Sequence, residues 1–123
     1  MKYEKAPEIK KKIEILIKKL KMDYIDLERI ECIRSFDAKT RAYARIWGMA
    51  KIFSEVCGIE PHYIIEVNGK KFDKLTKREK IKTLIHELLH IPKTFSGALL
   101  AHRGRYHRIN DREVEKIIHN IEI

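Results

Sequence analysis

The chain has 123 residues, which is enough for one core, and we expect residues 1–123 to fold as a single domain. It contains no apolar run long enough to cross a bilayer and no apolar signal segment after Met1, so the sequence argues against a membrane protein and favours a cytoplasmic location. Its 27 Lys and Arg outnumber its 18 Asp and Glu, and this net charge of +9 predicts either binding to nucleic acid or a basic surface with no specific partner.

The cysteine and amide content bears on the environment in which the protein works. Cys32 and Cys57 do not form a CxxC pair, and we expect both to stay reduced and buried rather than to form a disulfide. Ile, Lys and Glu are abundant, Gln is absent, and Asn occurs only at positions 68, 110 and 120. This composition is typical of a protein from a thermophile.

The first predicted element is an amphipathic helix over residues 1–22, with Pro7 in its first turn. The apolar side is Ile9, Ile13, Leu16, Ile17 and Leu20, and the basic side is Lys10, Lys11, Lys12, Lys18, Lys19 and Lys21. A helix that covers the core and exposes its basic side to water fits this pattern better than a helix that binds nucleic acid or a membrane surface.

Three strands are predicted in the middle of the chain. Residues 27–36 partly alternate between polar and apolar, and a turn at 37–40 follows. Residues 41–53 form the second strand, bent at Gly48, although its alanines also fit a helix. The clearest strand is 62–67. Together with helices at both ends of the chain, this pattern predicts an α+β fold with a small three-stranded sheet.

A turn at Asn68-Gly69 leads to a helix that is predicted over residues 77–91. Thr76 and Glu79 form a capping box at its start, and Pro92 disfavours helix beyond residue 91. The apolar residues at helical spacing are Ile81, Leu84, Ile85, Leu88 and Leu89. We therefore expect one side of this helix to be buried in the core.

The same helix carries an HExxH motif made by His86, Glu87 and His90. Positions i and i+4 lie on one helix face with Cβ atoms about 5–6 Å apart, so both imidazoles can reach one metal ion. Zinc suits them because it accepts histidine nitrogen without imposing a geometry of its own. Glu87 would lie beside the metal and accept a proton from metal-bound water. The alternative is two histidines satisfied by hydrogen bonds and a solvated glutamate.

Beyond Pro92 the sequence predicts a loop and then a C-terminal helix. Gly97 and Gly104 permit the backbone angles that a loop needs. The run from Asn110 to Glu113 is a second capping signature. The helix that it begins can pack on the core through Val114, Ile117, Ile118 and Ile121.

A catalytic zinc site needs a third protein ligand and keeps a fourth position open. The metzincin extension would require Gly at 93 and His at 96, and Lys93 and Ser96 exclude that class. His102 is the preferred third ligand because its loop is long enough to fold back to the helix end, and His107 is the second choice. Acidic candidates also remain, namely Asp111, Glu113 and Glu115.

The stretch from His86 to His102 resembles the metallopeptidases of archaea and phages, which are minimal zincins related to the SprT-like group. In that family a His-Glu-Leu-Leu-His-Ile-Pro run is followed by a Phe-x-Gly segment and a further histidine. The pattern falls on Phe95, Gly97 and His102 of this chain. The resemblance extends upstream through residues 41–72.

The resemblance implies that His86, His90 and His102 bind the metal ion and that Glu87 is the catalytic base. It also implies a zincin-like fold, in which a small sheet packs on the active-site helix. The segment 102–106 is similar to the SprT-type third-ligand segment, where an aromatic residue stands four positions after the histidine. The spacing from the second histidine is shorter here, and the zinc ribbon of SprT-like proteins is missing.

We therefore expect a zinc metallopeptidase that acts on a peptide or protein substrate. Candidates for a second donor to the oxyanion are Arg103, Tyr106 and His107, and the predicted strand within residues 41–49 would offer its edge to an extended substrate. The alternatives are a SprT-like protease acting on DNA-bound proteins, a basic nucleic-acid-binding protein with structural zinc and no turnover, and a degenerate zincin that binds metal and a partner.

Overall fold

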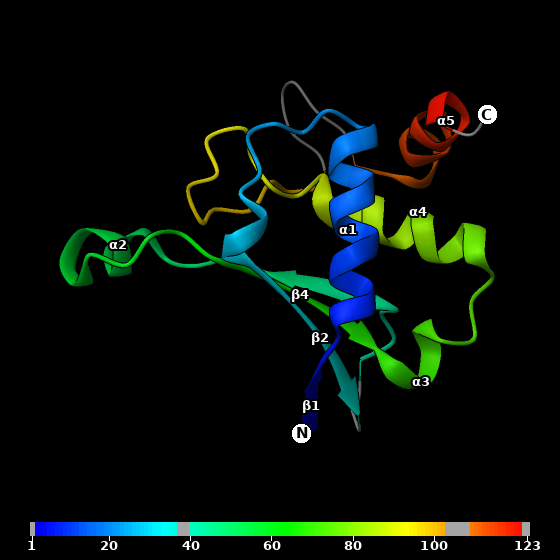
Figure 1. Cartoon of the computed structure of the whole chain (residues 1–123), viewed down its shortest axis with the longest axis horizontal. Helices are drawn as coiled ribbons and strands as arrows, with labels where there is room; N and C mark the ends of the chain where they lie inside the picture. The colour runs from blue at the N-terminus through cyan, green and yellow to red at the C-terminus, as the bar shows by residue number, and fades with distance from the viewer. Residues whose placement is uncertain (1, 37–39, 103–108, 122–123) are drawn as a thin grey trace.

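The computed structural model describes residues 2–36, 40–102 and 109–121. Over these residues the chain is an α+β structure with a four-stranded mixed sheet and five α-helices (Figure 1). In chain order the elements are β1 (Lys2–Lys5), α1 (Pro7–Lys19), a 3₁₀ turn (Leu27–Arg29), β2 (Ile30–Phe36), β3 (Ala44–Trp47), α2 (Lys51–Cys57), β4 (Tyr63–Asn68), α3 (Gly69–Phe72), α4 (Lys77–Leu88) and α5 (Asp111–Ile121). None of the described helices is both long and apolar enough to cross a membrane.

The sheet has the strand order β1-β2-β4-β3. The central pair β2 and β4 is parallel, and the two outer strands pair antiparallel with their neighbours. Alternate residues of β2 and β4 enter the core, namely Ile30, Cys32, Tyr63, Ile65 and Val67. The core continues into α1 and α4, and Figure 1 shows α1 crossing in front of the sheet, with α5 next to α4.

The prediction of a three-stranded sheet was wrong because the chain begins with a fourth strand. Residues Lys2–Lys5 pair with β2, and the helix that was expected over residues 1–22 runs only from Pro7 to Lys19. All four residues of β1 are exposed, so this edge strand has none of the apolar alternation that marks a half-buried strand. Pro7 also disfavours helix at the residue before it, which keeps the N-terminus extended.

The predicted strand over residues 41–53 is also shorter than expected. β3 covers Ala44–Trp47, and the chain then leaves the sheet and forms α2, which contains no buried residue and projects from the body at the left of Figure 1. At the exit, the Met49 amide donates to the Gly97 carbonyl at 2.8 Å, and a Cβ on Gly48 would lie 2.3 Å from that oxygen. The chain therefore needs glycine at position 48 to approach the 97 loop.

The other predicted elements agree with the structure, apart from their ends. β2 is preceded by a 3₁₀ turn, and the turn predicted at Asn68-Gly69 is instead the start of α3, which Asn68 caps because its Oδ1 accepts from the Lys71 amide at 3.3 Å. The capping box of α4 is confirmed, although the helix ends at Leu88. Cys32 is buried as predicted, while Cys57 is exposed, and both are free thiols. Of the turn predicted at 37–40, residues 37–39 lie outside the described part.

Candidate metal centre

The C-terminal end of α4 brings two imidazoles to one side of the helix. His86 lies in the last turn of α4, and His90 lies in the turn that follows, where its amide donates to the Glu87 carbonyl at 3.1 Å. The centroids of the two rings are 5.2 Å apart. This is the arrangement that the i, i+4 spacing predicts, since four residues carry the chain slightly more than one helical turn.

His102 returns to these two residues along the loop after Pro92. The Leu100 amide donates to the His90 carbonyl at 2.7 Å, which ties the end of the loop to the end of the helix. The His102 ring centroid lies 5.1 Å from that of His86 and 4.7 Å from that of His90. One nitrogen from each of the three rings can be chosen so that all lie within 4.8 Å of one another. The three histidines are therefore close enough to bind a single metal ion.

Hydrogen bonding fixes which nitrogen His90 can offer. Its Nδ1 lies 2.5 Å from the Leu100 carbonyl oxygen. A carbonyl only accepts hydrogen bonds, so Nδ1 donates to it and Nε2 is left with the lone pair that a metal needs. The sequence does not predict this contact, because the acceptor is the backbone carbonyl of Leu100 and the Leu100 side chain takes no part in it.

The surroundings of His86 keep its imidazole neutral. Burial lowers the pKa of His86 to about 4, and the neighbouring charges of His90 and His102 act in the same direction. Its Nε2 lies 3.2 Å from Nε2 of His102. A neutral imidazole is the form that binds a metal ion, so His86 is available as a ligand at neutral pH.

Glu87 lies beside the histidines and is buried, with 7% of its surface exposed. Burial raises the pKa of its carboxyl group to about 8. Among the described residues no side chain or backbone group donates a hydrogen bond to this carboxyl group, so only limited contact with water offsets the cost of burying its charged form. A cation or a water molecule beside it would relieve that cost.

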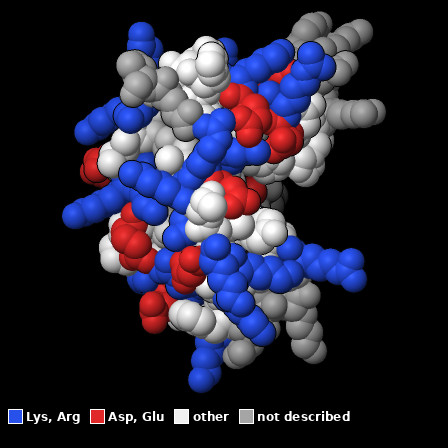
Figure 2. All heavy atoms as spheres, turned by 90° about the vertical axis from the view of Figure 1, so that its right-hand side faces the viewer, with Lys and Arg blue, Asp and Glu red and all other residues white. Residues whose placement is uncertain are grey.

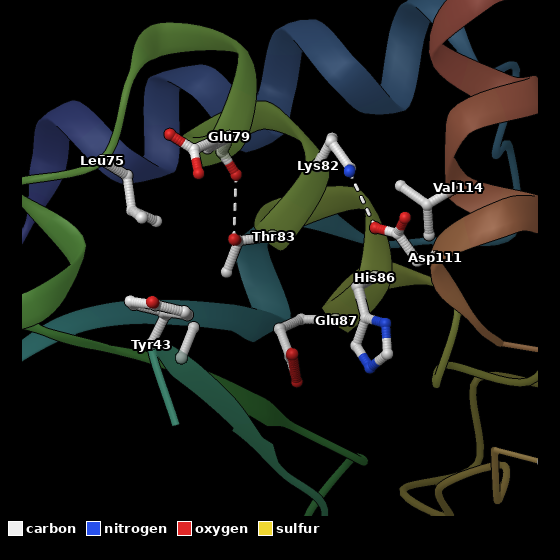
Figure 3. A pocket seen from close by; sticks show the side chains of 10 residues that line it. Tyr43, Leu75, Glu79, Lys82, Thr83, His86, Glu87, Asp111 and Val114 are labelled. Carbon is white, nitrogen blue, oxygen red and sulfur yellow. Dashed lines mark hydrogen bonds and ion pairs between the residues drawn. The ribbon is translucent and has the colours of Figure 1, made fainter. Parts of the chain in front are cut away.

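His86 and Glu87 both line a pocket of about 400 Å³. Figure 3 shows the two side chains projecting from α4 into the pocket, with Tyr43 on another wall. The remaining lining residues are Ala44, Leu75, Glu79, Lys82, Thr83, Asp111 and Val114. The pocket therefore lies between the outer strand β3 and the helices α4 and α5, next to the imidazole cluster.

The acidic candidates for the third ligand are engaged elsewhere. Asp111 pairs with Lys82 at 2.7 Å, as the dashed line in Figure 3 marks, and Glu115 also pairs with Lys82 at 2.7 Å. Glu113 lies 3.6 Å from Lys116. Within the part of the chain that the structure describes, these carboxylates do not join the imidazole cluster. Arg103, Tyr106 and His107 lie outside the described residues.

Sequence reasoning missed Tyr63 as a residue that positions the loop carrying His102. The Tyr63 hydroxyl donates to the Ala98 carbonyl at 2.7 Å and accepts from the Gly97 amide at 2.9 Å. Its ring also packs edge-on against Phe95, with the centroids 4.9 Å apart. Tyr63 thereby anchors the Phe-x-Gly segment to β4, and a tyrosine in a strand gives no sequence signal of such a role.

The family comparison agrees with this geometry. A family model described as "Putative phage metallopeptidase" matches residues 1–121, a range that includes α4, the loop and His102. Comparison with curated proteins and with solved structures gives no match.

Proposed function

The chain belongs to the phage metallopeptidase family, and from this premise we propose that it is a zinc-dependent, zincin-like peptidase whose residues 1–123 form one catalytic domain. The observation that carries the proposal is the convergence of His86, His90 and His102 next to a buried carboxyl group on the same helix. Metal ligands and a proton acceptor then lie together, at the wall of a pocket beside the outer strand of the sheet.

The donor set fits zinc. Three imidazole nitrogens with an open fourth position are a ligand set of catalytic zinc. Two nitrogens on one tetrahedral zinc ion lie about 3.3 Å apart, given bond lengths of about 2.0–2.1 Å. The Nε2 atoms of His86 and His102 are 3.2 Å apart, which is close to this separation. The hydrogen bond from His90 Nδ1 to the Leu100 carbonyl would hold this ring with its Nε2 toward the metal ion.

In the proposed reaction Glu87 is the group that accepts and returns a proton. Zinc at this site would lower the pKa of a water molecule and stabilise negative charge on the substrate oxygen. The carboxylate of Glu87 accepts a proton as water attacks the peptide carbonyl, and it then gives a proton to the departing amine. The pocket wall supports this role because Glu87 faces the same space as His86 (Figure 3).

We further propose that a peptide substrate lies along the outer edge of β3. The Tyr43 carbonyl accepts from the Asn68 amide of β4 at 2.8 Å. Hydrogen-bonded pairs alternate in an antiparallel ladder, so the backbone groups of Ala44 and Ile46 face away from β4. Ala44 also lines the pocket with Glu87. An extended peptide paired with this edge would pass the proposed catalytic group.

A matched pair of Glu→Gln variants tests the function. The full chain, loaded with zinc, is assayed against a quenched-fluorescence peptide library. Glu87→Gln should keep one zinc ion per chain and lose activity by at least about a hundredfold. This factor is the lower end of the rate enhancement that a general base contributes. Glu55→Gln, the same change at an exposed position of α2 that lines neither this pocket nor the metal centre, should leave cleavage intact. Cleavage by Glu87→Gln at the wild-type rate would refute the proposed role.

The choice of third ligand has its own test. His102→Ala should lower zinc affinity, measured by competition with a chelator of known affinity, while His107→Ala should leave it unchanged. The opposite result would move the third ligand to position 107. Neither variant should change the fold of the metal-free chain, which circular dichroism can check.

A further inference from the structure

A groove lies between α1, α4 and α5, and among the described residues none lines both this groove and the pocket at the metal centre. Its volume is about 990 Å³. The lining residues are Lys12, Ile15, Leu16 and Lys19 of α1, Lys77 and Ile81 of α4, and Ile118, Asn120 and Ile121 at the C-terminal end of the chain. Helix α4 lines the groove with residues of its first half, and its last turn carries His86 of the metal centre.

The floor of the groove is apolar and incompletely covered. Leu16 and Ile118 are buried, while Ile81 and Ile121 are partly buried against the core. Ile15 is 52% exposed, although it lies next to Leu16 on the side of α1 that faces the groove. Over the described residues this apolar surface is left open to water, and such a surface is a candidate for binding another molecule.

The rim of the groove is basic. Lys12 and Lys19 stand on one side and Lys77 on another, and none of the described residues that line the groove is acidic. None of these three lysines forms an ion pair with any described residue, whereas Lys82 on the same helix holds both Asp111 and Glu115. Figure 2, which views the molecule from the right of Figure 1, shows basic side chains spread widely over that face. An occupant of the groove should therefore carry negative charge.

The spacing of the lysines indicates which class of molecule can bind in the groove. Lys12 and Lys19 are seven residues apart, so they lie about 10 Å apart along α1, with Ile15 and Leu16 between them. A lipid with one anionic head group reaches only one of the two lysines. Duplex nucleic acid carries repeated charges but keeps the faces of its bases stacked inside, so it offers little apolar surface to cover Ile15. An amphipathic helix with acidic residues seven positions apart can pair with both lysines and cover the floor.

We propose that this groove binds an acidic amphipathic α-helix of a protein partner. The apolar face of that helix lies on Ile15, Leu16 and Ile81, and its acidic residues pair with Lys12, Lys19 and Lys77. This places a docking surface at the start of α4, separate from the proposed metal centre at its other end.

The test uses the full chain and two synthetic peptides of about 20 residues, a length at which designed helices form in water. Both peptides carry the same leucine face, and they differ only in having Glu or Lys at two positions seven residues apart beside it. Binding is measured by fluorescence anisotropy. The wild type should bind the Glu peptide at least about tenfold more tightly than the Lys peptide, because two ion pairs replace two repulsions.

Charge reversal at the rim should exchange these preferences. Lys12→Glu with Lys19→Glu should bind the Lys peptide more tightly than the Glu peptide. The control is Lys11→Glu with Lys18→Glu, which has the same charge change and the same spacing on the same helix but does not line the groove. This control should keep the wild-type preference, and circular dichroism of all variants should be unchanged.

Three results would overturn the proposal. The first is equal binding of the two peptides by the wild type, and the second is an equal loss of Glu-peptide affinity in the two double variants. The third is tighter binding of the wild type to duplex DNA or to phosphatidylglycerol vesicles than to the Glu peptide, with a loss confined to the Lys12 and Lys19 variant. That last result would assign the groove to another class of ligand.

Discussion

Replacing Glu87 by Gln should stabilise the metal-free protein, and the gain should depend on pH. The pKa of this buried carboxyl group is raised from 4.5 to about 8 in the folded chain. Between these two values the folded state binds more protons than the unfolded state, so this group makes the protein less stable as pH rises. Gln has the shape of the protonated acid and remains neutral, so the variant does not lose stability in this way as pH rises.

The size of the effect follows from the shift in pKa. One pKa unit corresponds to about 1.4 kcal/mol, so the gain in unfolding free energy should be about 4 kcal/mol at pH 8 and less than about 1 kcal/mol at pH 5. Urea unfolding followed by circular dichroism, with a chelator present, measures both values. Glu79→Gln is the control, because hydrogen bonds from Thr76 lower the pKa of Glu79 and no gain at high pH is expected there.

Zinc should reverse the result, since a nearby dication favours the charged carboxylate. A raised pKa of Glu87 is refuted if the difference in unfolding free energy between wild type and Glu87→Gln is the same at pH 5 and pH 8 without metal. It also fails if Glu79→Gln gains as much stability at pH 8 as Glu87→Gln does.

Three more predictions concern the elements that support the centre. Thr76→Ala removes the capping box of α4 and should cost about 1 kcal/mol of unfolding free energy in urea titrations. The pKa of His86 is lowered from 6.5 to about 4, so the metal-free protein should lose up to roughly 3 kcal/mol as pH falls through this range, and unfolding curves of His86→Asn should not show that loss. Gly48→Ala places a Cβ 2.3 Å from the Gly97 carbonyl oxygen and should weaken zinc binding, measured by chelator competition. Gly58→Ala, at φ 68° in open space, should cost only about 1 kcal/mol and leave zinc binding unchanged.

The sequence predicts the parts of the site that depend on neighbours along one helix. The capping box at Thr76 marks the start of α4, and helical spacing places His86 and His90 on one side, because both signals are local. His102 lies close to these two residues, although loop length alone leaves several acceptable candidates for a third ligand.

The sequence does not predict the parts of the structure that depend on contacts between distant segments of the chain. β1 exists because residues 2–5 find a free edge of β2, and nothing in their composition signals it. β3 stops at Trp47 because the chain turns to meet the Gly97 carbonyl, which lies far along the sequence. The anchoring of the loop by Tyr63 is equally non-local. The strand that lines the pocket is therefore the part for which prediction from sequence was weakest.

X-ray absorption at the zinc edge of the loaded full chain is the sharpest test of the three-histidine site. We expect one zinc ion with three imidazole nitrogens and one oxygen at about 2.0–2.1 Å, and the loss of one imidazole in His102→Ala. A spectrum with fewer than three imidazoles, or with sulfur at about 2.3 Å, would contradict it.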